Sequence, residues 1–145
     1  MRRGLTTALV LLTLIGAAPN AASQETWRWE DCRFRSYMNP DDAFNRTELL
    51  LVIRCGVRLW PVYGGYAKAV SVAECESGLG PRATNPNGYY GIYQFAPSTF
   101  ASVHTRWRAL WERMGVPAAI YNPRSNILHA VRKASADGWG AWGCA

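Results

Sequence analysis

The chain has 145 residues, of which 49% are hydrophobic, so it is long enough for one domain with an ordinary core and leaves little room for a second. Charged residues make up 18%, which excludes a disordered charged tail. The formal net charge is +6, yet the sequence contains no run of Lys and Arg, so the charge does not favour nucleic acid as a partner.

The N-terminus has the pattern of a secretory signal peptide over residues 1–23. Arg2 and Arg3 precede the apolar stretch Leu5–Ile15, and small residues follow up to a cleavage site before Gln24 or one residue earlier. The apolar stretch is short for a membrane helix, although an uncleaved anchor stays an alternative. We therefore expect a secreted protein, extracellular or associated with the cell wall, without stable membrane insertion.

Four cysteines follow the signal peptide: Cys32, Cys55, Cys75 and Cys144. An even count in a small exported domain predicts two disulfides, and four cysteines allow three pairings. No Cys-x-x-Cys spacing is present, and His104 and His129 are the only histidines, so we expect neither a metal site nor a cofactor.

The remaining sequence predicts a mainly α domain over 45–145, preceded by an irregular segment over 24–44. Asn45 and Glu48 have the spacing of a capping box and begin a helix that stops at Pro61. A second helix is expected from about Tyr66 to about Glu76. Later proline and glycine signals predict helices over 97–115 and from 122–123 to about 138. Between them, Asn-Gly and several aromatics over 85–95 predict a small β-hairpin or looped ribbon.

Glu76 is the acid that stands out, because it lies where the second helix should end. The negative end of the helix dipole disfavours ionisation of a carboxyl group there, as a general acid requires. The alternative is an ordinary solvated glutamate at a helix end. No Asp or Glu occurs from Ser77 through Trp111, so a second catalytic carboxylate would have to come from Glu74 or Asp137.

Four motifs in order resemble the lysozyme-like lytic transglycosylases. They are the Glu-Ser pair within 73–78, the Gly-Ile-Tyr-Gln segment within 88–95, Pro-Ser-Thr-Phe at 97–100 and Pro-Arg-Ser-Asn-Ile at 123–127. The Cys-Glu-Ser-Gly start, the Asn-Gly-Tyr-Tyr-Gly turn and the Gly-Trp-Gly-Ala-Trp-x-Cys end are similar to the resuscitation-promoting factors, which share the same broad fold. The resemblance covers about 66–145 and implies an α+β lysozyme-like fold.

The resemblance implies that Glu76 is the catalytic acid/base. The residues expected to bind substrate are Gln94, Ser77, Tyr90, Asn87 and Asn126. Gln94 could instead be an amide that faces water, Ser77 a helix cap, and Tyr90 a core aromatic. The resemblance also implies a Cys75–Cys144 disulfide, which leaves Cys32 to pair with Cys55.

The activity implied by this resemblance is cleavage of the MurNAc-GlcNAc β-1,4 bond of peptidoglycan. We expect the protein to act as a monomer. With a single carboxylate, the expected product is 1,6-anhydro-MurNAc. A muramidase that uses water is the alternative enzyme, and a lysozyme-like protein that binds or signals without cleavage is the alternative of another class. The partner in each case is the peptidoglycan glycan strand.

Overall fold

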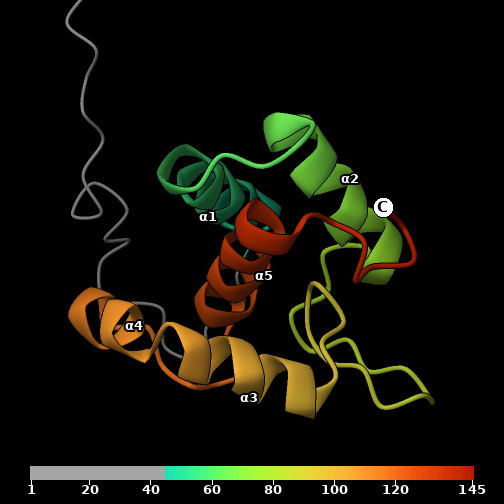
Figure 1. Ribbon diagram of the computed structural model, residues 1–145. Helices are drawn as coiled ribbons and strands as arrows, with labels where there is room; N and C mark the ends of the chain where they lie inside the picture. The colour runs from blue at the N-terminus through green and yellow to red at the C-terminus, as the bar shows by residue number, and fades with distance from the viewer. Residues whose placement is uncertain (1–44) are drawn as a thin grey trace, which may run out of the picture.

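A computed structural model describes residues 45–145, and the expected signal peptide, the segment 24–44 and Cys32 lie outside this range. The described part contains five helices (Figure 1): α1 (Arg46–Leu59), α2 (Gly65–Ser77), α3 (Pro97–Arg106), α4 (Arg108–Met114) and α5 (Pro123–Asp137). This architecture confirms the mainly α class that the sequence predicts.

Helix α5 is the centre of the core. Asn122 caps it by accepting a hydrogen bond from the backbone N–H of Ser125, and Pro123 occupies its first turn. All residues over 125–131 are buried, so this part of the helix is surrounded on every side (Figure 1).

Helix α1 packs directly against α5. Its capping box is present, with Asn45 and Glu48 exchanging two hydrogen bonds of 3.0 Å. Gly56 faces α5 so closely that an added Cβ would lie 3.3 Å from Cβ of Val131. A side chain at position 56 would therefore push the two helices apart.

The segment 78–96, between α2 and α3, is a folded loop with no named strand. Its only ladder contacts are isolated bridges, which pair Tyr90 with Thr84 and with Phe95. The small hairpin or ribbon expected over 85–95 is thus present as a looped ribbon. It occupies the right side of Figure 1, next to the lower end of α2.

The helix expected over 97–115 is wrong as a single element, because the chain breaks at Trp107. This residue has φ −123° and ψ 30°, which lies outside the helical region. The guanidinium groups of Arg106 and Arg132 lie 4.4 and 4.6 Å from the centre of its indole ring. Stacking on an arginine of α5 holds the ring at the junction, and α3 and α4 turn around it.

The C-terminal tail returns from α5 to the end of α2, where the label C lies in Figure 1. A disulfide joins Cys75 to Cys144, as expected. Trp139 and Trp142 of the tail are buried and contribute to the hydrophobic core. No helix among residues 45–145 has both the length and the apolar character needed to cross a membrane.

Candidate active site

Glu76 lies in the last turn of α2, one residue after the disulfide. The helix ends at Gly78, which adopts a left-handed conformation with φ 62° and donates to the carbonyls of Ala73 and Glu74. The Glu76 side chain is half-buried. Its Oε1 accepts a hydrogen bond of 3.3 Å from the backbone N–H of Cys144. The backbone of Glu76 is therefore fixed by the helix, while solvent and ligands can reach its side chain.

The tail that contacts Glu76 is anchored to the loop through Trp142. Trp142 donates its indole N–H to the carbonyl of Tyr93 at 2.8 Å, and its ring packs against Phe95. Tyr93 is fully buried and donates its hydroxyl to the carbonyl of Ala69 in α2. Burial raises the pKa of Tyr93, so this hydroxyl stays a neutral donor. Tail, loop and α2 thus form one connected unit around Glu76.

Ser77 links the end of α2 to the loop. Its hydroxyl donates to the carbonyl of Ile92 at 2.7 Å and accepts from the backbone N–H of Gly80 at 3.1 Å. Both bonds join the Ser77 side chain to the backbone of the loop that follows α2. The hydroxyl is thus directed at the loop rather than at the carboxylate of Glu76.

Gln94 closes the tight bend of the loop. It has a positive φ of 46°, which is uncommon outside glycine, and its side chain is 7% exposed. Its amide Nε2 donates to the carbonyl of Gly91 at 2.8 Å and to that of Ala83 at 3.3 Å. Within residues 45–145, no hydrogen bond is made to its Oε1. The alternative reading, an amide that faces water, does not fit a side chain that is this enclosed, and one acceptor of the amide has no partner among these residues.

Asn126 lies in the core beneath the loop. Its Oδ1 accepts from the backbone N–H of Tyr93 at 2.9 Å, and its Nδ2 donates to the carbonyls of Tyr90 and Ile120 at 3.2 and 2.8 Å. The side chain is 1% exposed, which leaves it no surface for a sugar. Expected as a substrate contact, Asn126 instead holds the backbone of the loop from α5.

Tyr90 and Asn87 lie on the outer side of the loop. Tyr90 is half-buried, and its ring meets that of Tyr121 edge-on with 5.5 Å between centroids. The hydroxyl of Tyr121 lies 3.1 Å from that of Thr84. Asn87 is exposed at the turn. Sequence reasoning did not select Tyr121 or Thr84, because only the fold brings them together.

The other acids of the described chain are engaged away from Glu76 or exposed on other helices. Glu74 forms an ion pair with Arg46 of α1. Asp137, at the end of α5, accepts from Arg106 at 2.9 and 3.0 Å and from Lys133 at 3.0 Å. These bonds lower the pKa of the Asp137 carboxyl. Glu48 is the partner in the α1 cap, and Glu112 is exposed on α4.

The two histidines form a stacked pair. Nδ1 of His104 lies 3.1 Å from Nε2 of His129, and the rings stack with 5.3 Å between centroids. His129 is fully buried, as expected for a structural residue. Across residues 45–145, no group of three His, Cys, Asp or Glu side chains is placed to hold a metal ion.

Comparison with known proteins identifies the family of this chain. Neither the curated proteins nor the solved structures yield a match. The profile of the transglycosylase-like domain matches residues 65–145, from the start of α2 to the end of the chain. This region is more than half of the sequence and contains Glu76, the loop, α5 and the tail. The chain therefore belongs to the transglycosylase-like domain family.

Proposed function

We propose that this protein is a peptidoglycan lytic transglycosylase in which Glu76 is the only acid/base. Family membership supports an activity of the transglycosylase type on peptidoglycan. The observation that carries the finer proposal is the isolation of Glu76. Its half-buried carboxylate contacts the N–H of Cys144, and no other acid of the described chain is bonded to it.

The isolation of Glu76 matters because glycosidases that use water or a covalent intermediate need two carboxyl groups. These groups lie about 5–5.5 Å apart in retaining enzymes and about 6.5–9.5 Å apart in inverting ones. Two other acids could supply the second group, and both are paired with cations. Glu74 binds Arg46 of α1, and Asp137 binds Arg106 of α3 and Lys133 of α5. A mechanism that needs one carboxyl group suits this arrangement best.

The proposed reaction uses Glu76 twice. The protonated carboxyl donates its proton to the oxygen between MurNAc and GlcNAc as the bond from that oxygen to C1 breaks. The acetamido oxygen of MurNAc stabilises the positive charge at C1. The 6-hydroxyl of the same MurNAc then attacks C1 and gives its proton to the Glu76 carboxylate. The products are 1,6-anhydro-MurNAc and a new GlcNAc end, and Glu76 is protonated again.

The other candidate site residues take two kinds of role in this proposal. Tyr90 and Asn87, on the outer side of the loop, contact the sugars. Gln94 offers its remaining acceptor, Oε1, to an acetamido N–H. Ser77 and Asn126 act on the loop backbone and are positioning residues. The protein works outside the cytoplasm, because peptidoglycan is an extracytoplasmic polymer. The proposal includes removal of residues 1–23 on export and action as a monomer.

The products of wall digestion test the proposal. Purified, oxidised protein is incubated with peptidoglycan sacculi, and the soluble fragments are analysed by mass spectrometry. We expect fragments that end in 1,6-anhydro-MurNAc. Reducing MurNAc ends without the anhydro product would instead identify a muramidase. Turbidity that stays constant while the protein sediments with the sacculi would identify a binding protein.

A further inference from the structure

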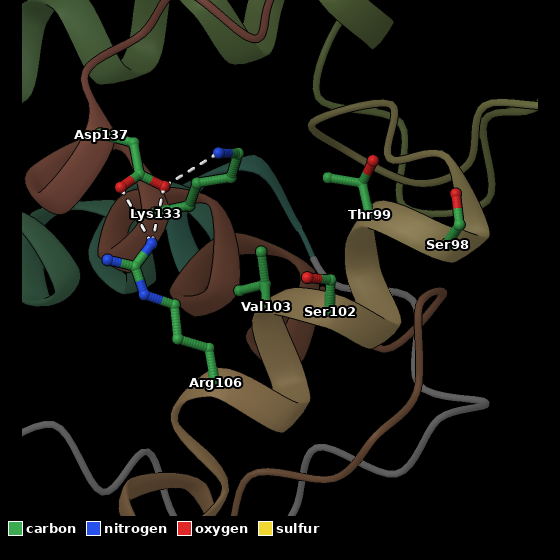
Figure 2. A pocket seen from close by; sticks show the side chains of 7 residues that line it. All are labelled: Ser98, Thr99, Ser102, Val103, Arg106, Lys133 and Asp137. Carbon is green, nitrogen blue, oxygen red and sulfur yellow. Dashed lines mark hydrogen bonds and ion pairs between the residues drawn. The ribbon is translucent and has the colours of Figure 1, made fainter.

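A hollow lies between α3 and α5, and Glu76 is not among the residues that line it. Its volume is about 260 Å³. Three hydroxyl groups of α3 line it, together with two cations and one carboxylate; the polar lining consists of Ser98, Thr99, Ser102, Arg106, Lys133 and Asp137. Figure 2 shows Thr99 and Ser102 on one side of the hollow, with Lys133 and Asp137 of α5 on the other.

The lining carries an excess of positive charge. Arg106 and Lys133 both bind Asp137, which fixes the two cations at the rim and satisfies the carboxylate. Two positive charges against one negative charge leave one positive charge uncompensated. Lys133 uses one of its three donors on Asp137, and Arg106 uses one of its guanidinium nitrogens. Donors therefore remain on both cations for an anionic group.

The hydroxyl groups add further donors of the same kind. Ser98 and Ser102 lie one turn apart on α3, and Thr99 lies beside them, so all three face the same side of the helix. None of their hydroxyls is hydrogen-bonded to another residue within 45–145. A ligand that only accepts hydrogen bonds and carries one negative charge, such as a carboxylate, matches donors arranged in this way.

The hollow also lies within reach of a strand bound at Glu76. Cys144, which contacts Glu76, is seven positions after Asp137, so the Cα atoms of Asp137 and Cys144 are at most about 25 Å apart. Each MurNAc of a glycan strand can carry a peptide stem, and three extended residues of such a stem span about 10 Å. A stem two or more sugars from the cleaved bond is the part of the substrate that can enter the hollow.

We propose that the α3–α5 hollow binds a free carboxylate of the peptide stem and thereby selects stem-bearing glycan. This inference rests on the proposed function, because it takes peptidoglycan to be the substrate. It adds to that function a second contact that distinguishes strands with acidic stems from bare or amidated strands.

Binding measurements on the full oxidised chain test the inference. The chain carries Glu76→Gln, so that the ligand is not consumed. The probes are a soluble muropeptide with free stem carboxylates, the same muropeptide with these carboxylates amidated, the sugar without a stem, and a glycerol phosphate oligomer. We expect the free-carboxylate muropeptide to bind about twofold to fivefold more tightly than its amidated form. Its addition should shift the amide NMR signals of Thr99, Ser102 and Lys133.

Variants of the hollow then assign the effect. Ser102→Asp places a like charge opposite the ligand at an exposed helical position, and Lys133→Gln removes one cation. Each should abolish the preference for the free-carboxylate muropeptide, whereas Arg113→Gln, on the exposed surface of α4, should keep it. Equal binding of the free and amidated muropeptides by the unaltered hollow would overturn the inference. Tighter binding of glycerol phosphate than of the muropeptide would also overturn it, by assigning the hollow to a phosphate polymer.

The failure of this inference can be told from the failure of the proposed function. If sacculi are cleaved to anhydro products while the stem carboxylate makes no difference, only the inference fails. If no cleavage occurs but the hollow still discriminates between the muropeptides, the catalytic proposal fails and the stem contact stands.

Discussion

The backbone N–H of Cys144 donates to Oε1 of Glu76 at 3.3 Å, although 68 positions separate the two residues in the chain. The disulfide between Cys75 and Cys144 lies directly beside this hydrogen bond. The tail after α5 thus contacts the carboxylate of the proposed acid/base directly. Any change that releases the tail should be felt at the carboxylate.

The first prediction concerns the identity of the acid. Glu76→Gln keeps the size of the side chain but cannot donate a carboxylic proton, so the rate of sacculus cleavage should fall by about 10²–10⁴-fold. The melting temperature should stay close to that of the unaltered protein. Glu74→Gln is the matched control, because it removes a carboxylate two residues away that is paired with Arg46. A Glu76→Gln rate within about threefold of the original, judged against that range, would mean that another residue is the acid.

The second prediction concerns Gln94. Gln94→Ala removes both the hydrogen bonds to Gly91 and Ala83 and the acceptor offered to substrate. We expect turnover to fall at least about tenfold, which corresponds to about 1.4 kcal/mol of transition-state stabilisation. Steady-state kinetics on soluble glycan strands measure the loss. Gln94→Glu is the informative companion, since it keeps an acceptor but replaces the donor. Turnover unchanged in Gln94→Ala would place this residue outside the substrate groove.

The third prediction concerns Asn126, whose role is structural support of the loop. Asn126→Ala leaves the N–H of Tyr93 and the carbonyl of Ile120 without their partner, and each such loss costs about 1–3 kcal/mol. The carbonyl of Tyr90 loses one of its two hydrogen bonds and keeps the one from the backbone N–H of Phe95. Urea denaturation should show a free energy of unfolding lower by about 3 kcal/mol or more. The control, Asn87→Ala on the exposed turn, should change it by less than about 0.5 kcal/mol. A small effect at Asn126 would mean that water replaces its bonds.

The helices that begin and end on local signals could be predicted from the sequence. The Asn45–Glu48 box and Pro123 each act through neighbours within one turn, so their effect does not depend on the rest of the fold. The break at Trp107 could not be predicted in this way, because Arg132 of α5 stacks on that ring from 25 positions further along the chain. Local propensity favours one continuous helix, and the tertiary contact overrides it.

In the candidate site, too, residue types could be predicted from local motifs, whereas tertiary contacts could not. The motifs select Glu76, in the last turn of α2, and Gln94, in the loop that follows this helix. They do not indicate that Asn126 is enclosed, because its three partners lie in two other segments. They also miss the contact of Tyr121 with Tyr90 and Thr84, which joins residues 31 and 37 positions apart. Residue type predicts chemistry, whereas exposure depends on which segments meet.

The fourth prediction concerns the tail disulfide. Replacing both Cys75 and Cys144 by serine opens a loop with a sequence separation of 69, and the chain-entropy estimate for such a loop is about 4 kcal/mol. The melting temperature should fall, and turnover should fall as well when it is measured well below that new melting temperature. The reason is that the N–H of Cys144 no longer holds Glu76 in place. Full turnover by a folded, disulfide-free variant would show that the tail is not needed to position the acid.

The last prediction is a pH dependence of stability that originates at His129. Its Nδ1 lies 2.8 Å from the carbonyl of Ser125, which can only accept, so Nδ1 carries the hydrogen and Nε2 accepts from Nδ1 of His104. The ring is enclosed by Phe100 and Trp111, whose rings stack on it at 4.6 and 4.2 Å. Burial lowers the pKa of His129 from 6.5 to about 4, with a smaller lowering from His104 and an opposing effect of the Ser125 hydrogen bond. Protonation would also turn Nε2 into a donor facing another donor.

The unfolded chain therefore binds a proton at His129 between pH 6.5 and about 4, while the folded chain does not. The contribution of the neutral His129 to the free energy of unfolding should be fully present above about pH 6.5. It should decrease as the pH falls through this window, by up to about 3 kcal/mol in total. Arg106 and Lys133 lower the pKa of Asp137 from its ordinary value of 3.8. The stability that this carboxylate contributes is therefore lost only below about that pH, outside the window of His129. Urea denaturation at pH 7, 5.5 and 4.5 measures the slope, and His129→Gln should flatten it. A wild-type unfolding free energy that is constant from pH 7 to 4.5 would contradict the assignment of a neutral, buried His129.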